Sequence, residues 1–324
     1  MDRKAKEAWA EFEKRSEATL LLRLSQKDAT IQDLQKQLAD IRAAQAAAAA
    51  AAEAEAAAAA AAAAQPPVTP KQYANVAGAV DGDLLEKIEY NAADSTVIAD
   101  KFDIDITLTK LLVMKDGTWL SSEVLTFILE WWRDKHKQGA QKSMPSGEYD
   151  PKCYFANTYF YSKLVPDKES YTYNNVRRWT AKLDLLNPAR CDKMIIPINE
   201  RDVHWYAACI NFRDKRTEVY DSLGGEGSLV HKNLKKWIQD ESQNKYKKDF
   251  DFDGWTEYKA RQCPMQTNGC DCGVFAALFC MHMSLDREFD FEQSDIPLMR
   301  RWIVQTIYNV GKEQGDFKLP EGIE

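Results

Sequence analysis

The sequence has little of what a membrane-spanning or exported protein needs. Its longest tract of small side chains, 46–64, is interrupted by Glu53 and Glu55, and alanine is only weakly apolar. The first fifteen residues, MDRKAKEAWAEFEKR, are charged from the second position and contain no apolar core of a signal peptide. We therefore expect no membrane partner and an intracellular protein of the nucleus, the cytoplasm or both.

Surplus positive charge is also missing. The chain has 43 Lys and Arg against 50 Asp and Glu, which gives a net charge of −7. Proteins that bind nucleic acid through its phosphates depend on an excess of Lys and Arg. The charge balance therefore argues against a nucleic-acid partner and fits a partner with a basic surface.

The cysteines do not form the pattern of a disulfide framework or of a metal site. The odd count of seven argues for free thiols in a reducing compartment. Cys270 and Cys272 are separated by one residue, but no second Cys/His pair at a suitable spacing accompanies them. We predict no metal ion and no cofactor.

Residues 1–64 form one compositional unit. A seam with alternating spacings of four and three, typical of a coiled coil, is followed by an alanine-rich tract that prolines at 66, 67 and 70 end. We predict a helical or weak coiled-coil extension with an alanine-rich spacer over 1–64 and a proline-containing linker over 65–80. Self-association or targeting through 1–64 and a tolerated appendage both remain open. The seam consists of Leu20, Leu24, Lys27, Ile31, Leu34, Leu38 and Ile41.

From residue 81 the pattern becomes that of a globular domain. Period-two alternation or short apolar runs predict strands, and longer amphipathic or apolar stretches predict helices. Helices around a run of adjacent strands predict the α+β class. The predicted strands are 103–108, 193–199, 205–212 and 216–222, and the predicted helices are 122–137, 229–245, 274–284 and 296–310.

A polar, glycine-containing turn, 266–273, delivers Cys272 to the start of the apolar segment 274–283. Such a segment predicts a buried helix, and the N–H groups and dipole at a helix start favour a thiolate over a thiol. The thiolate is the reactive form. We therefore predict that Cys272 is a nucleophile, with Cys270 of the same turn as its competitor.

A base for this nucleophile must come from four histidines. His136 and His231 lie in lysine-rich polar surroundings and are predicted to be solvated. His282 lies ten residues along the helix from Cys272, or about 15 Å at the helical rise, which is too far. His204 opens a predicted strand after a polar turn, so we predict that it is the base.

A third group must orient the base. Asp221 ends the strand that follows that of His204, and hairpin pairing would bring the two together. An aspartate directly after a strand can also be a simple turn former. The residues alone leave both interpretations open.

Three motifs now match a known family in order: Val203-His204-Trp205, Tyr220-Asp221-Ser222-Leu223 and Gln266-Thr267-Asn268-Gly269-Cys270-Asp271-Cys272-Gly273. They resemble the ubiquitin-like-protein-specific cysteine proteases, the SUMO protease family of Ulp and SENP type. The resemblance runs from about Ile104 to Val310. Further matches are Trp119-Leu120, Asn157-Thr158-Tyr159-Phe160-Tyr161, Val176-Arg177-Arg178-Trp179 and Pro197-Ile198-Asn199.

The resemblance implies a papain-like cysteine protease fold with permuted catalytic elements and a central, mainly antiparallel sheet flanked by helices, in a ubiquitin-like-protein protease domain over 81–324. It implies that Cys272 is the nucleophile, that His204 is base and then acid, and that Asp221 orients His204. Gln266 falls where the family has its oxyanion-hole side chain, and one such donor is typically worth about 10²–10³ in rate. The family's Asp-Cys-Gly maps onto 271–273, which favours Cys272 over Cys270, and a glycine there permits close approach of a substrate backbone.

Trp119 and Trp205 match tryptophans that, in the family, wall a narrow tunnel over the Gly-Gly tail of the substrate. The alternative for any tryptophan is core packing. The chain departs from the family at Ser121-Ser122, where an Asn-Asp pair is usual and the acid helps to grip the modifier. This departure weakens the choice of SUMO specifically.

The leading hypothesis is a thiol isopeptidase that cleaves after the Gly-Gly C-terminus of SUMO or a related ubiquitin-like modifier, in conjugates and in precursors. The first alternative is a protease of the same fold that acts on NEDD8 or on proteins that are not modifiers. The second is a module that binds a modifier without cleaving it.

Overall fold

The computed structural model describes residues 80–139, 152–167, 170–259 and 263–320, together with Lys14 and Ile323. The chain divides into two units, Met1–Gln65 and Pro66–Glu324, and the elements below belong to the second. The predicted extension over 1–64 and nearly all of the predicted linker lie outside the described residues, and their boundaries stay predictions.

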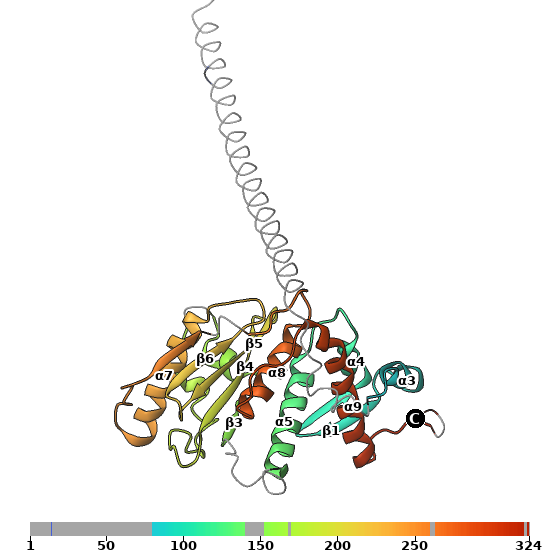
Figure 1. The fold of residues 1–324 in the computed structure, drawn as a ribbon, viewed down its shortest axis with the longest axis horizontal. Coiled ribbons are helices and arrows are strands. Elements are labelled where there is room, and N and C mark those ends of the chain that lie inside the picture. The colour runs from blue at the N-terminus through green and yellow to red at the C-terminus, as the bar shows by residue number, and fades with distance from the viewer. Residues whose placement is uncertain are drawn as a thin grey trace, which may run out of the picture. The chain divides into compact units, whose positions relative to one another are not determined.

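A five-stranded mixed sheet forms the centre of the second unit (Figure 1). The three central strands are antiparallel neighbours, as predicted, whereas each edge strand pairs in parallel with its neighbour. The sequence did not indicate the edge strands, which are three and four residues long. In sheet order the strands are β3 (Cys153–Phe155), β4 (Lys193–Glu200), β5 (His204–Asn211), β6 (Arg216–Tyr220) and β7 (Thr256–Lys259).

The central strands are apolar on both faces because helices cover both. Along β4, Ile195 faces a core that contains α8 (Cys272–Ser284), while Ile196 faces a core that contains α7 (Ser228–Tyr246). Helix α6 (Phe160–Leu164) packs on β4 within the second core. The sequences of these strands are therefore continuously apolar and do not alternate between apolar and polar residues.

Helix α8 is the most deeply buried helix of the described part of the chain, and all thirteen of its residues are buried. An apolar surface all round requires cover on every side. The sheet provides one side, and α5 (Ser122–Gly139) and α9 (Ile296–Gln314) pack against α8 as well (Figure 1). The predicted helix at 274–284 is confirmed, and it begins at Cys272.

The remaining elements stand beside α9. They are α3 (Leu84–Asn91), the two-stranded sheet of β1 (Val97–Lys101) and β2 (Ile104–Thr107), and α4 (Leu108–Leu111). Strand β2 was predicted from its alternation. Short 3-10 turns complete the described part: η1 (Leu112–Met114), η2 (Tyr173–Asn175) and η3 (Gln293–Asp295).

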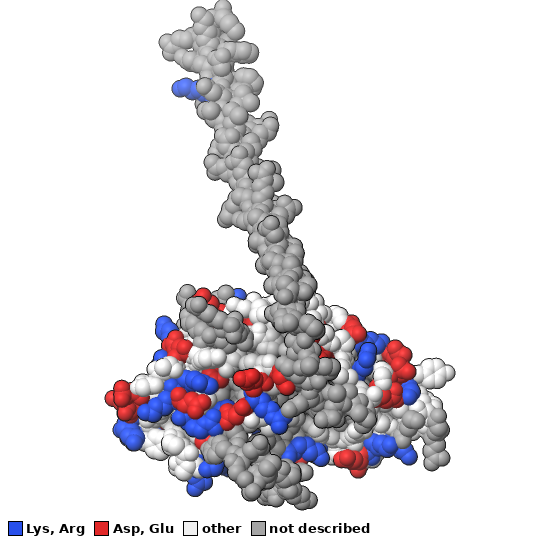
Figure 2. Space-filling view, viewed as in Figure 1, with Lys and Arg blue, Asp and Glu red and all other residues white. Residues whose placement is uncertain are grey.

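The surface carries both signs of charge. On the face seen in Figure 2, Lys and Arg are interspersed with Asp and Glu rather than gathered into one basic field. Within the described stretches, no helix combines the length and apolar character required to cross a bilayer.

Candidate active site

The β5–β6 hairpin brings His204 and Asp221 together. Ala207 of β5 pairs with Tyr220 of β6, so the next residue, Asp221, lies beside the start of β5. The Nε2 atom of His204 is 2.7 Å from Oδ1 of Asp221. The contact between His204 and Asp221 that the hairpin predicts is therefore present.

Asp221 also holds the turn that follows β6. Its Oδ1 accepts the N–H of Leu223 at 2.8 Å, and its Oδ2 accepts the N–H of Gly225 at 3.2 Å. A Cβ atom at position 225 would overlap this carboxylate, so the turn needs glycine there. The sequence left open whether Asp221 is the partner of His204 or a turn former, and in the structure it is both.

Cys272 is the first residue of α8 and is 5% exposed. It is hydrogen-bonded to the imidazole of His204. Burial alone would lower the pKa of His204, but the hydrogen bonds with Asp221 and Cys272 outweigh it and raise that pKa to about 9. At neutral pH the imidazole is therefore held in its charged form beside the Asp221 carboxylate.

Cys270 has different surroundings from Cys272. It lies on the turn before α8, half-buried, and its Sγ is 3.3 Å from Oδ1 of Asn268. Burial and the negative charge of Asp271 raise the pKa of the Cys270 thiol. A raised pKa disfavours the thiolate, which agrees with the preference for Cys272.

Gln266 is buried and contacts Ser222, the residue after Asp221. Its Oε1 accepts the hydroxyl of Ser222 at 2.7 Å, and its backbone N–H donates to the Ser222 carbonyl at 3.0 Å. Its Nε2 donates to the carbonyl of Asn268. Because each end of the amide has its own partner, the orientation of this side chain is fixed.

Trp119 and Trp205 line a cavity of about 150 Å³ that Cys272 also lines. Trp119 is 51% exposed, whereas Trp205 is 5% exposed and donates its Nε1–H to the Leu120 carbonyl at 3.1 Å. The two tryptophans are thus joined through the backbone that follows Trp119. The structure brings both of them to Cys272, and Trp205 is at the same time part of the buried core.

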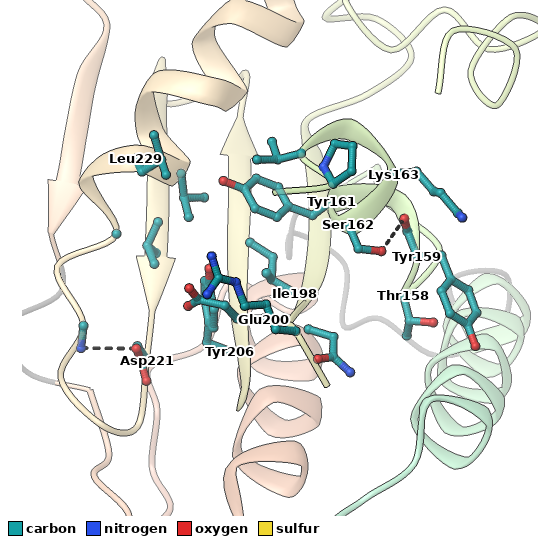
Figure 3. Close-up of a pocket in the computed structure, with 18 of the residues that line it drawn as sticks. Thr158, Tyr159, Tyr161, Ser162, Lys163, Ile198, Glu200, Tyr206, Asp221 and Leu229 are labelled. Atoms are coloured by element: carbon teal, nitrogen blue, oxygen red, sulfur yellow. Dashed lines mark hydrogen bonds between the residues drawn. The ribbon is translucent and has the colours of Figure 1, made fainter. Parts of the chain in front are cut away.

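A larger hollow of about 560 Å³ adjoins this cavity and shares Ser122, Asn199 and Asp202 with it. In Figure 3, Tyr161 and Tyr206 line this hollow, and Asp221 lies at the foot of its strand with its hydrogen bond to the following turn.

Ser121, the other residue of the pair that departs from the family, accepts the Val124 N–H at 3.4 Å and so caps α5.

His231 and His282 have partners away from Cys272, and the prediction that His231 is solvated was wrong. His231 is fully buried rather than solvated, and its Nδ1 is 2.8 Å from Oγ1 of Thr217. His282 is buried with its Nε2 at 2.9 Å from Oδ1 of Asp290. The side chain of His136 lies outside what the structure describes. In the described ranges no three His, Cys, Asp or Glu side chains are grouped to hold a metal ion.

Sequence reasoning missed a buried ion pair beside Cys272. Asp271 directly precedes Cys272, and its Oδ1 lies 2.7 Å from Nη2 and 3.0 Å from Nε of Arg300. Its Oδ2 accepts hydrogen bonds from Nδ2 of Asn268 and Nε2 of Gln293, both at 2.7 Å. Burial would raise the pKa of Asp271, but these partners outweigh it and lower that pKa.

Known proteins are similar to this chain in sequence. Ubiquitin-like-specific protease 1A of Arabidopsis thaliana is 31% identical over 227 residues, which cover 69% of this chain and 44% of that protein. Sentrin-specific protease 2 of Homo sapiens is 30% identical over 213 residues, which cover 65% of this chain and 33% of that protein. The chain thus matches less than half the length of either relative.

The fold has a solved counterpart. The X-ray structure of the C-terminal Ulp1 protease domain in complex with Smt3, the yeast ortholog of SUMO, matches with a TM-score of 0.55 at 23% identity. The match covers 76% of this chain and 99% of that one.

The family comparison covers the site itself. Residues 118–314 match the family described as the Ulp1 protease family, C-terminal catalytic domain. This stretch includes Trp119, His204, Asp221 and Cys272. The chain therefore belongs to the Ulp1 protease family.

Proposed function

We propose that this chain is a thiol protease and isopeptidase that cleaves after the Gly-Gly C-terminus of SUMO or a related ubiquitin-like modifier. The observation that carries the proposal is the line of contacts from Asp221 through His204 to Cys272, next to a small cavity lined by two tryptophans. This is the arrangement that nucleophilic catalysis requires: a nucleophile, a base and a group that orients the base.

The first half of the reaction forms an acyl-enzyme. The Cys272 thiolate attacks the carbonyl carbon of the last glycine, and the carbonyl oxygen gains the negative charge. Nε2 of Gln266 and the backbone N–H of Cys272 stabilise this oxyanion; the latter is one of the N–H groups that a helix start leaves without an intrahelical partner. His204 donates its proton to the leaving amine, the C–N bond breaks, and a thioester to Cys272 remains.

The second half regenerates the thiolate. His204, now neutral, takes a proton from a water molecule, and the resulting hydroxide attacks the thioester carbonyl. The C–S bond breaks and releases the modifier with a free carboxylate. Asp221 stabilises the imidazolium that forms and keeps the ring in its orientation, and no cofactor takes part.

The cavity supports glycine as the residue that is recognised. Its volume of about 150 Å³ is small, and two flat indole side chains line it together with the nucleophile. Glycine has no Cβ and fits where other residues would collide. A lysine side chain or a precursor peptide can then supply the leaving amine from the open side.

The identity of the modifier is tested with a probe panel. Full-length protein is mixed with SUMO, NEDD8 and ubiquitin that each end in a Gly-Gly vinyl sulfone, and the covalent adduct is followed by gel shift. We expect labelling by SUMO or a related modifier in wild type and in Cys270→Ser, and none in Cys272→Ala. NEDD8 labelling alone would select the alternative substrate, and absence of labelling by every probe contradicts the proposal.

The non-catalytic alternative predicts a different outcome. A module that only binds would retain SUMO on a column but release no lysine-linked conjugate and form no adduct. A Cys272→Ala variant that still retains SUMO, together with a cleaving wild type, excludes this alternative.

The proposal also covers the compartment in which the enzyme acts and its self-association. All seven cysteines are free of disulfide bonds, which supports action in a reducing compartment, the nucleus or the cytoplasm. Self-association through residues 1–64 stays a prediction. Light scattering from the full chain and from a chain without these residues tests it.

A further inference from the structure

Arg300 of α9 is a buried cation that has no part in the reaction described above. Its side chain is 2% exposed and touches neither His204 nor the Gln266 amide in the described contacts. Its guanidinium donates to four backbone carbonyls and one carboxylate. These acceptors are Val113 O at 3.2 Å, Lys115 O at 3.3 Å, Thr118 O at 2.8 Å, Cys270 O at 3.4 Å and Asp271 Oδ1 at 2.7 Å.

The acceptors belong to two separate segments of the site. The carbonyls of 113–118 lead directly into Trp119, and Cys270 and Asp271 lead directly into Cys272. One side chain therefore joins the backbone that carries the exposed tryptophan to the backbone that carries the nucleophile.

The first segment directs several carbonyl oxygens toward this donor. The Thr118 hydroxyl lies 2.5 Å from both the Val113 and the Lys115 carbonyl oxygens, which gathers the carbonyls into a tight turn. Three carbonyl oxygens then converge on the guanidinium. A planar group with several N–H donors can serve these three carbonyls and a carboxylate at once.

The two segments also meet at Leu120. Its carbonyl accepts the Trp205 indole N–H, and its side chain packs against Gly273 of α8. These contacts fix the position of the Trp119–Leu120 backbone relative to Cys272. Arg300 fixes the residues that precede Trp119 through the Thr118 carbonyl.

We propose that Arg300 is a positioning residue that fixes the position of Trp119 relative to Cys272. The Gly-Gly tail that Trp119 binds then lies where Cys272 can attack it. This inference rests on the proposed function. A lysine in its place keeps the positive charge beside Asp271 but loses the planar fork that reaches the carbonyls of 113–118. The Arg300→Lys change therefore separates the tryptophan segment from the nucleophile without removing the charge.

The test compares two reactions of the same thiol in full-length protein. Iodoacetamide is small and reports the reactivity of Cys272 alone, followed by mass spectrometry of the peptide. The SUMO Gly-Gly vinyl sulfone reports that reactivity together with the grip on the tail. For Arg300→Lys we expect vinyl sulfone labelling to slow by about 10–100-fold, the range typical of a small misplacement, and iodoacetamide labelling to stay within about 2-fold.

Arg301→Lys is the matched control, because Arg301 is the neighbouring residue and is exposed. Neither reaction should change in it. Any other pattern in Arg300→Lys, namely equal slowing of both reactions, no change in either or slowing of iodoacetamide alone, overturns the inference.

Two further measurements keep the inference testable. Thr118→Val removes the hydroxyl that gathers the carbonyls but leaves the buried ion pair intact, so it should give the same pattern more weakly even where Arg300→Lys folds poorly. In a Trp119→Ala background, Arg300→Lys should cost less than 2-fold in vinyl sulfone labelling, because the residue that it positions is gone. A full cost in that background overturns the inference.

Hydrogen exchange separates this inference from the proposed function. Amides of 112–119 should exchange faster in Arg300→Lys than in wild type or Arg301→Lys, and amides of β5 should not change. This readout needs no substrate. Wild type that no Gly-Gly probe labels would refute the proposed function, whereas unchanged exchange at 112–119 would refute the role of Arg300.

Discussion

Gly273 and Leu120 touch so closely that no side chain fits between them. A Cβ atom at position 273 would lie 2.5 Å from Cβ of Leu120 and 3.1 Å from its Cδ2. The side chain of Leu120 therefore occupies the space beside this glycine. Gly273 therefore sets the distance between the start of α8 and the segment that carries Trp119.

Gly273→Ala should lower both stability and activity. The added methyl group must push Leu120 away, and overpacking of this kind costs about 1–3 kcal/mol of unfolding free energy. The displacement moves Trp119 from the cavity, so kcat/KM should fall further than the stability loss explains. Urea unfolding and cleavage of a SUMO C-terminal fluorogenic substrate measure the two effects.

Gly269→Ala is the control for this prediction. Gly269 lies in the same loop, and a Cβ atom there would meet nothing within 4 Å. Equal loss of activity in both variants would show that the loop, rather than the contact with Leu120, is sensitive to alanine.

Ser222→Ala should lower kcat with little effect on KM. The Ser222 hydroxyl holds the Gln266 amide by its oxygen, and without it the amide loses the contact that fixes its orientation. A hydrogen bond of this kind is worth about 0.5–1.5 kcal/mol, so kcat should fall by about 3–10-fold. A donor that acts on the oxyanion acts in the transition state, which is why the effect appears in kcat.

A double variant checks this route. Gln266→Ala should cost about 10²–10³ in kcat, the usual value of one oxyanion donor. If Ser222 acts through Gln266, then Ser222→Ala should add almost nothing in the Gln266→Ala background. Additive losses would mean that Ser222 supports the site by another path.

The sequence predicted the centre of the fold better than its edges. Strands β4, β5 and β6 and helices α5, α7, α8 and α9 were predicted because they are long and their apolar residues follow a regular pattern. Strand β7 spans four residues, two of them charged, and carries no such pattern. It pairs with β6 in parallel after the chain has passed through α7, and the local sequence does not specify that pairing.

Residues of the candidate site were predictable where chemistry depends on side-chain type. The contact of His204 with Asp221 followed from the hairpin, and Cys272 followed from the apolar helix after a polar turn. Arg300 was missed because four of its acceptors are backbone carbonyls, which have no sequence signature. His231 was misread because its lysine neighbours lie on the exposed face of α7, while His231 shares the buried face with Leu234 and Ile238.

Asp271→Ala should destabilise the protein more than any surface change. It leaves the positive charge of Arg300 buried without its carboxylate, and breaking a buried pair in this way costs about 3–5 kcal/mol. Replacing both partners, as in Asp271→Ala with Arg300→Met, removes the orphaned charge but also removes the donor to the carbonyls of 113–118, so it should recover only part of that loss. Chemical denaturation of the three proteins measures the difference, and a double variant as unstable as the single one contradicts the prediction.

The pH dependence of Asp271 has a definite sign. Its pKa is lowered in the folded state, so the stability that it contributes is present above its usual unfolded value, near 4, and is lost as the pH falls through the folded value. Wild type should therefore lose stability on acidification from about pH 4 downward, and Asp271→Ala should lose less over the same interval.

Asp221→Asn should move the alkaline limit of activity to lower pH. The pKa of His204 is about 9 because the hydrogen bonds with Asp221 and Cys272 outweigh burial, which acts in the opposite direction. His204 must be protonated to donate to the leaving amine, so wild-type kcat/KM should stay high through neutral pH and fall as the pH rises through about 9. Without the carboxylate, the pKa returns toward its usual value near 6.5 and the limit moves with it.

The same substitution should alter rate and stability in linked ways. Loss of the orienting aspartate costs on the order of 10⁴ in kcat in triad hydrolases, and we expect a loss of that order here. Because the folded pKa of His204 is raised, its contribution to stability is complete below about 6.5 and is lost as the pH rises through about 9. The stability difference between wild type and Asp221→Asn should therefore be larger at pH 6 than at pH 10. A pH–rate profile whose alkaline limit stays in place in Asp221→Asn would show that Asp221 does not set the protonation of His204.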